Sequence, residues 1–146
     1  MSRQTIIAGN WKMNTRCDGA VALAKSVVAA VGETPSVQVV LCPPSVYLSS
    51  VADAVAGTSV QLGAQNLYAA EDGAFTGEVN AAMLTDVGCG FVILGHSERR
   101  ALMGETDADV SKKLHAALAG NLVPIVCVGE TLQEREAGKM EEVIQT

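Results

Sequence analysis

The chain has 146 residues, of which 49% are hydrophobic, and its formal net charge is −6. This length suits one globular domain and is short for two, so we expect residues 1–146 to form a single domain. The acidic balance argues against nucleic acid or an anionic membrane as a partner, and no apolar run approaches the roughly 20 residues of a membrane span.

Short apolar runs alternate along the chain with segments of helical period, a pattern typical of βαβ units and a parallel sheet. The predicted strands are Thr5 to Ala8, Val37 to Leu41, Val60 to Ala64, Phe91 to Leu94 and Val123 to Val128. Each run is apolar nearly throughout, as expected where both faces of a sheet are covered. The predicted helices are Ala20 to Val31, Val46 to Val55, Ala81 to Val87 and Ala108 to Leu118.

Two segments depart from this alternation. The connection from Gln65 to Val79 has no helical period and contains Asp72-Gly73 and Thr76-Gly77, so we predict a structured loop. Loops of that length usually serve a function or an interface. The last residues, Glu141 to Thr146, still read as a helix without a capping glycine or proline, so we expect the chain to be cut within a helix.

The start of the chain and its cysteines bear on the cellular compartment. Met1 to Gln4 lead directly into a predicted strand instead of a charged region and a signal core. No C-x-x-C pair or zinc-binding spacing is present; the scattered cysteines are Cys17, Cys42, Cys89 and Cys127. We therefore expect a soluble cytoplasmic protein with reduced structural thiols and without a metal site.

Polar residues with catalytic potential follow two of the predicted strands. The sequence GHSERR, from Gly95 to Arg100, begins where the fourth strand ends, and Asn10 and Lys12 follow the first strand. Ligands bind at the carboxyl ends of parallel strands, where a rigid backbone meets a variable loop. Because His96, Asn10 and Lys12 then face one rim, they are candidates for a proton donor, an amide donor and a cation at an active site.

Each of these residues also has a structural interpretation. His96 could cap a short helical turn that begins at Ser97, and Lys12 could be an ordinary surface lysine. A solvated charge cluster, in which each exposed pair contributes at most about 1 kcal/mol, is an alternative for the acidic and basic residues Glu98, Arg99, Arg100 and Glu105. We favour a structural role for the last three of these. Packing or surface positions are favoured for Cys127 and His115.

Four motifs in order give this chain a resemblance to a known family. They are GNWKMN (Gly9 to Asn14), GAFTGE (Gly73 to Glu78), ILGHSERR (Ile93 to Arg100) and CVGETLQEREAGK (Cys127 to Lys139). With these motifs the whole chain resembles the triosephosphate isomerase family. The resemblance implies the eight-unit (β/α) TIM-barrel fold, of which this chain carries about the first five units. It also implies a homodimer that interconverts dihydroxyacetone phosphate and glyceraldehyde 3-phosphate without a metal or organic cofactor.

The resemblance implies a role for each matching residue. Lys12 would hold the phosphoryl group and help to stabilise an enediolate oxygen, and neutral His96 would polarise the carbonyl and shuttle a proton. Asn10 would donate a hydrogen bond beside them, and Glu98 would pair with Lys12. Cys127, on the fifth strand, would support the site. The loop residues that would contact a second subunit are Gln65, Phe75, Thr76, Gly77 and Glu78.

The family's general-base glutamate has no counterpart in this chain and would lie beyond residue 146. Glu130 follows the fifth strand, but it does not match the position of that base. One alternative is therefore a catalytically incompetent partial barrel that self-associates through its sheet edges and the Gly73 to Glu78 loop. Another sugar-phosphate enzyme on the same barrel is disfavoured by the combination of Asn10, Lys12 and His96-Ser97-Glu98.

Overall fold

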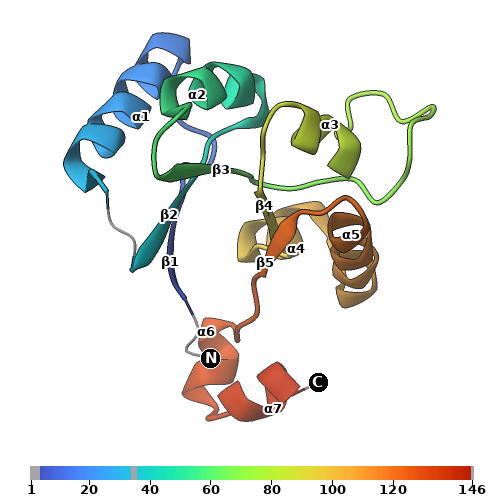
Figure 1. Cartoon of the computed structure of the whole chain (residues 1–146). Coiled ribbons are helices and arrows are strands. Elements are labelled where there is room, and N and C mark those ends of the chain that lie inside the picture. Colours follow the sequence, from blue (N-terminus) through green and yellow to red (C-terminus); the bar gives the residue numbers. More distant parts are fainter. Residues whose placement is uncertain (1–3, 34–35, 146) are drawn as a thin grey trace.

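The computed structural model describes residues 4–33 and 36–145, and it contains one parallel sheet. The strands are β1 (Thr5–Asn10), β2 (Val37–Cys42), β3 (Val60–Ala64), β4 (Phe91–Leu94) and β5 (Val123–Val126). They pair in the order β1-β2-β3-β4-β5, and each pair is parallel. Figure 1 shows that the sheet curls into part of a barrel with helices around it. The predicted α/β class and its five parallel strands are confirmed.

The helices occupy the segments between and after the strands. They are α1 (Cys17–Val31), α2 (Leu48–Val55), α3 (Ala81–Asp86), α4 (Ser97–Met103), α5 (Asp107–Ala119), α6 (Leu132–Glu136) and α7 (Met140–Gln145). A short 3-10 turn at Ser45–Tyr47 precedes α2. The loop from residue 65 to residue 79 contains no helix or strand, as predicted. The helix predicted at the chain end is present as α7, whereas Thr146, like Met1 to Arg3, lies outside the described residues.

The fifth strand is shorter than predicted. It ends at Val126, whereas the apolar pattern suggested Val128. The backbone N–H of Cys127 still donates to the carbonyl of Leu94 at 2.8 Å, but β4 ends there and offers no further partner. Cys127 therefore follows the strand instead of lying on it.

Side chains of successive strand residues enter two separate cores, as the pleat of a strand requires. On the outer face the sheet packs against helices, and the buried strand residues there are Leu41, Val60, Leu62, Ala64, Val92 and Leu94. Helix residues of the same core are Ala20, Ala24, Leu48, Val51, Val55, Ala81, Leu84, Val110 and Ala117. On the inner face of the curl a smaller core consists of Val40, Cys42, Phe91 and Ile93.

Gly63 allows the inner core to close. A Cβ atom built at this position would lie 2.7 Å from the Sγ atom of Cys42 and 3.2 Å from the Cβ atom of Phe91. Neither neighbour can move far, because both are buried in the inner core. A side chain at position 63 would therefore push β2 and β4 apart and disturb the strand ends beyond them.

The two edge strands are exposed. Ile7 on β1 is 60% exposed and Val123 on β5 is 47% exposed, while β4 is buried along its whole length. The expectation that every strand is covered on both faces is thus wrong for the edges: Ile6 and Ile7 of β1 point to opposite faces, and both are exposed. The open edges expected for five strands of a barrel are present.

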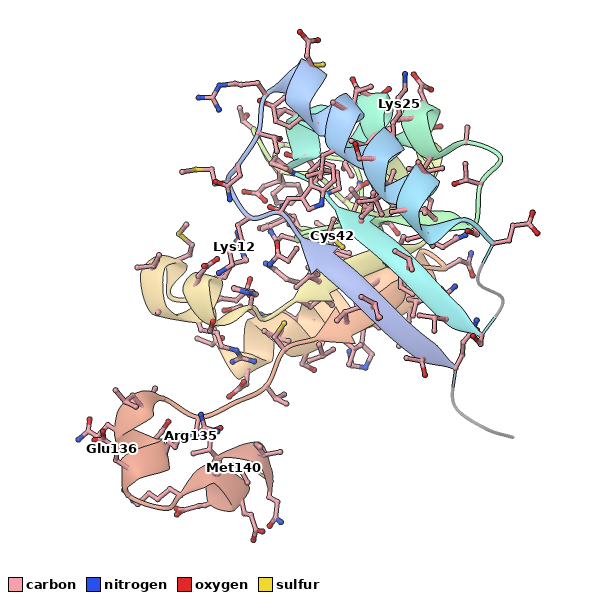
Figure 2. The ribbon with its side chains drawn as sticks, turned by 90° about the vertical axis from the view of Figure 1, so that its left-hand side faces the viewer. Lys12, Lys25, Cys42, Arg135, Glu136 and Met140 are labelled. Atoms are coloured by element: carbon pink, nitrogen blue, oxygen red, sulfur yellow. The ribbon has the colours of Figure 1, made fainter. Side chains whose placement is uncertain are left out.

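The two last helices lie apart from the sheet (Figure 2). α6 and α7 contact each other beyond the carboxyl end of β5 (Figure 1), and their apolar residues Leu132, Met140 and Ile144 are exposed. Among the described residues, no helix is both long enough and apolar enough to cross a membrane.

We expect residues 1–146, produced alone, to bind a hydrophobic dye and to self-associate. The exposed apolar edge residues and helix faces have no cover among the residues that the structure describes, and patches of this kind cause aggregation. Dye fluorescence and light scattering measure both properties. A monodisperse monomer that melts in one sharp cooperative transition would contradict this expectation.

Candidate active site

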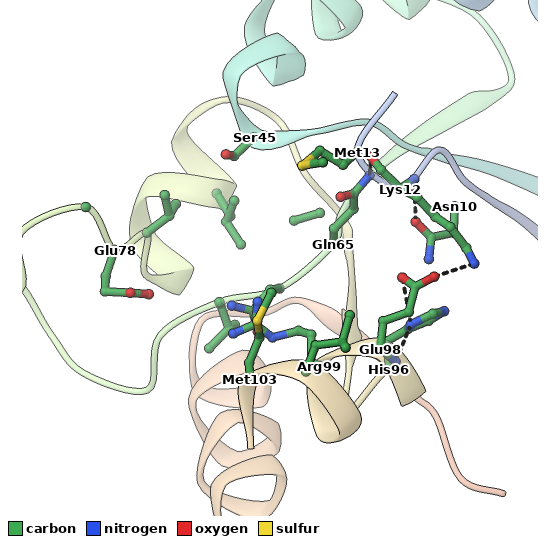
Figure 3. Close-up of a pocket in the computed structure, with 17 residues that line it drawn as sticks. Asn10, Lys12, Met13, Ser45, Gln65, Glu78, His96, Glu98, Arg99 and Met103 are labelled. Carbon is green, nitrogen blue, oxygen red and sulfur yellow. Dashed lines mark hydrogen bonds and ion pairs between the residues drawn. The ribbon is translucent and has the colours of Figure 1, made fainter. Parts of the chain in front are cut away.

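A pocket of about 520 Å³ lies at the carboxyl end of the sheet (Figure 3). Polar residues of its wall come from several strand ends: Asn10 ends β1 and Lys12 follows it, Gln65 follows β3, and His96 follows β4. Parallel strands bring their carboxyl ends to one edge, so residues far apart in the sequence meet here. The residues predicted to share a rim do so.

Lys12 is held in an unusual backbone conformation. Its φ angle is 55°, in the left-handed region that residues with a side chain rarely adopt. The Oδ1 atom of Asn10 accepts a hydrogen bond from the Lys12 backbone N–H at 2.9 Å. This leaves the amide nitrogen of Asn10 available as a donor toward the pocket.

The side chain of Lys12 reaches across the pocket to Glu98. Its Nζ atom donates to Glu98 Oε1 at 2.6 Å, and both side chains are about half exposed. The hydrogen bond from Lys12 is the main cause that lowers the pKa of Glu98 below its usual range. The pairing that the resemblance implied is therefore present, and Glu98 stays a carboxylate beside the cation.

His96 both caps a helix and faces the pocket. Its Nδ1 atom accepts a hydrogen bond from the backbone N–H of Glu98 at 3.2 Å, in the first turn of α4. Because Nδ1 accepts, the hydrogen of a neutral imidazole lies on Nε2. The Nδ1 atom also lies 3.4 Å from Glu98 Oε2. The structural alternative and the functional one are thus compatible, because a ring that accepts from the helix at Nδ1 has Nε2 as its donor.

Arg100 anchors the start of α4 to the sheet. Its Nε atom donates to the carbonyl of Gly95 at 2.8 Å, and its Nη1 atom contacts Asp107 at 2.5 Å. Gly95 itself has a φ angle of 68°, and a Cβ atom there would lie 2.9 Å from Val110. The turn between β4 and His96 therefore requires glycine and is held by a guanidinium group.

A second ionic cluster lies beneath the site and is buried. The Glu105 side chain is 3% exposed and accepts hydrogen bonds from Lys113 and, at 3.2 Å, from Arg99. The Nζ atom of Lys113 also donates to Asn66 Oδ1 at 2.8 Å. Burial by itself would raise the pKa of Glu105, but the hydrogen bonds from these cations outweigh it and lower the pKa. The alternative interpretation of Glu105 as part of a solvated, exposed charge cluster is therefore wrong, because its side chain is buried.

Sequence reasoning missed Lys113 and Asn66, although a signal for Lys113 was present. Lys113 lies three residues after Val110 and four before Ala117, on the face of α5 that is buried in the core. A lysine in a buried stripe needs a charged partner. The partner, Glu105, precedes the same helix.

Other candidates lie outside this arrangement. Glu130 contacts Arg135 at 3.3 Å and does not line the pocket. Burial raises the pKa of the Cys127 thiol, although Arg100 partly opposes this effect. Burial also raises the pKa of Cys42 to about 12. His115 is exposed on α5 and contacts the carbonyl of Ser111. These residues fit the structural interpretations given to the thiols and to His115.

The loop from residue 65 to residue 79 reaches the pocket at both of its ends. Gln65 lines the pocket and donates hydrogen bonds to two backbone carbonyls of this chain, while Gly77 and Glu78 line its other side. The tip between them is exposed, and the rings of Tyr68 and Phe75 pack there in a tilted arrangement with centroids 4.8 Å apart. The loop tip therefore projects from the body with its own internal packing.

Comparisons with known proteins agree on one family. Residues 5–146 match the family model described as triosephosphate isomerase. A triosephosphate isomerase from Rhodopirellula baltica is 77% identical over 146 residues, which is 100% of this chain and 58% of that protein. One from Alcanivorax borkumensis is 51% identical over 144 residues, which is 99% of this chain and 57% of that protein.

A solved structure agrees with the sequence comparisons. The crystal structure of triosephosphate isomerase from Bartonella henselae superposes with a TM-score of 0.92 at 37% identity, and covers 98% of this chain and 59% of that chain. The chain thus spans somewhat more than half the length of these relatives. The fold predicted from the resemblance is confirmed over the part that is present.

Replacing Lys113 by Met tests the buried cluster. We use a chimera of residues 1–146 followed by the part of the Rhodopirellula baltica protein beyond the aligned region. Loss of a partner for a buried carboxylate is expected to lower the free energy of unfolding by about 3 kcal/mol. Lys112→Met, on the same helix with a 72% exposed side chain, should change it by less than about 0.5 kcal/mol.

The effect of Lys113→Met should also depend on pH. The folded-state pKa of Glu105 is lowered, so its stabilising contribution is present above the unfolded pKa and is lost as the pH falls through the folded pKa. Urea unfolding measures the free energy of unfolding of the parent chimera and of Lys113→Met. The difference between the two should therefore be smaller at acid pH than at neutral pH. Equal effects of Lys112→Met and Lys113→Met would contradict the buried cluster.

Proposed function

The chain belongs to the triosephosphate isomerase family, and on this premise we propose that it supplies the electrophilic half of a site that interconverts dihydroxyacetone phosphate and glyceraldehyde 3-phosphate. The observation that carries the proposal is that His96, whose Nδ1 accepts from the helix, and the Lys12 cation lie on the wall of one pocket. We further propose a cytoplasmic location and no nucleic-acid or membrane partner, in keeping with the acidic composition.

Moving a proton between adjacent carbons creates negative charge on the carbonyl oxygen. A donor and a cation placed at that oxygen lower the barrier, because they stabilise charge that develops only in the transition state. His96 would donate from Nε2 and then exchange the proton between the two oxygens of the enediolate. Lys12 would bind the phosphoryl group and neutralise the developing oxyanion, with Asn10 as an additional donor.

Glu98 would orient Lys12 instead of acting as the base. Its pKa is lowered by the Lys12 hydrogen bond, and a weakly basic carboxylate held by a cation is poorly suited to remove a proton from carbon. The base is expected in the part of the relatives' length that this chain does not span. The proposed reaction uses no metal or organic cofactor, since a side-chain donor and a cation supply the electrostatic stabilisation.

We also propose that the protein forms a homodimer. Exposed apolar residues rim the pocket, with Met13 95% exposed, Leu102 74% exposed and Met103 65% exposed. The loop tip from Phe75 to Glu78 is exposed as well, and a protruding loop together with an apolar rim suits a reciprocal contact between two copies. In this proposal Thr76 of one copy lies beside Lys12 and Glu98 of the other.

The alternative remains a partial barrel that self-associates without catalysis. The exposed apolar edges at Ile7 and Val123 favour it for residues 1–146 alone. The two functions differ in what happens when the missing part of the barrel is supplied. Completion of the barrel should cover the edges and restore turnover only if the residues of this chain form a competent half-site.

The chimera with the Rhodopirellula baltica segment tests this directly. We expect it to interconvert the two triose phosphates in a coupled assay, whereas residues 1–146 alone should give no turnover. A folded chimera without isomerase activity would refute the proposed function.

His96→Gln in the chimera separates the role of the donor from that of the scaffold. Loss of a proton-transfer group should lower kcat by roughly 10² to 10⁴. His115→Gln, an exposed position on α5, is the matched control and should keep full activity. An unchanged kcat in His96→Gln would remove that residue from the mechanism.

Thr76→Arg in the chimera tests the dimer. A long cation at the loop tip should block a close contact with the Lys12 side of a second copy, so the mass from light scattering should fall to that of one chain. Glu71→Arg changes an exposed residue of the same loop and should leave a dimer. A dimer in both variants would place the interface elsewhere.

A further inference from the structure

Gln65 connects the turn that carries Lys12 to the end of β2. It follows directly after β3, and its Nε2 atom donates to the backbone carbonyl of Lys12 at 2.9 Å and to that of Cys42 at 2.9 Å. The Cys42 carbonyl also accepts the backbone N–H of Trp11 at 3.1 Å. One amide group therefore joins the ends of β2 and β3 to the turn after β1.

The turn that Gln65 contacts is strained. Lys12 has a φ angle of 55° and Thr15 has one of 78°, although neither is glycine and Thr15 is β-branched. Such conformations persist only where the surroundings fix them. At Lys12 the Asn10 side chain holds the N–H and Gln65 holds the C=O, and no other donor to this carbonyl is found in the described part of the chain.

We propose that Gln65 is a positioning residue for Lys12. Both amide hydrogens of Gln65 are used within this chain, so its side chain acts on the Lys12 turn independently of any contact with a second copy. Without these hydrogen bonds, the Lys12 peptide can rotate toward negative φ, and the Nζ atom then leaves Glu98. The effect expected on catalysis rests on the proposed function, whereas the effect on the position of the Lys12 side chain does not.

The test is Gln65→Met in the chimera, since Met has a similar length and no donor. The first readout is the pKa of Glu98, followed by NMR of carboxyl-labelled protein. The pKa of Glu98 is lowered mainly by the hydrogen bond from Lys12, so we expect this pKa to rise toward the ordinary carboxyl range in Gln65→Met. The second readout is kcat/KM, which should fall by roughly 10² if the cation is displaced by about 1 Å.

Gln133→Met is the matched control, because Gln133 is exposed on α6 and does not line the pocket. It should change neither readout. If Gln65→Met does not fold, Gln65→Asn keeps the amide but is too short to reach both carbonyls, and the same results are expected.

The two readouts separate the possible outcomes. An unchanged Glu98 pKa in the variant would overturn the proposal, even if activity fell, because Gln65 would then not act through Lys12. A Glu98 pKa already in the ordinary range in the parent chimera would also overturn it. If the parent chimera is inactive but the Glu98 pKa rises in Gln65→Met, the positioning role stands and the proposed function fails.

Discussion

The parallel register of the sheet is the constraint on which the pocket depends. Asn10 pairs with Cys42 in the β1–β2 ladder, and β4 runs in the same direction, so the first and fourth strand ends meet at one edge. Only in this arrangement can Lys12 reach Glu98 at 2.6 Å across 86 residues of sequence. An exposed ion pair of this kind adds little stability. Its importance is that it fixes where the cation lies.

The sequence predicted those parts of the structure that depend on local pattern. Apolar runs located all five strands, and the polar residues after β1 and β4 located Lys12 and His96. It did not predict interactions that depend on distant partners. Gln65 reaches the Lys12 carbonyl across 53 residues and Lys113 reaches Asn66 across 47, and no periodicity encodes such pairs. The extent of β5 was missed because a strand ends where its neighbour ends, which the apolar pattern of Val123 to Val128 does not record.

His96 shows why a structural interpretation and a functional one need not compete. A helix cap requires an acceptor at Nδ1, and a group that polarises a carbonyl requires a donor at Nε2. One imidazole ring can meet both requirements, because its two nitrogens are distinct and the ring carries its hydrogen on Nε2 when Nδ1 accepts. Arg100 and Gly95 then fix the position of the capped helix relative to β4. The cap of α4 and the proposed chemistry of His96 therefore depend on the two nitrogens of one ring.

Strain at Lys12 has a consequence for the loop that begins at Gln65. A residue in the left-handed region relaxes when its restraints loosen, and one of the two restraints on Lys12 belongs to this loop. The other end of the loop carries Gly77 and Glu78 to the opposite wall of the pocket. A second copy that orders the exposed tip would thus also steady Gln65, and through it the cation. Assembly and the geometry of the pocket are in that case linked through Gln65 within one chain, in addition to the proposed contact of Thr76 with the Lys12 side of the second copy.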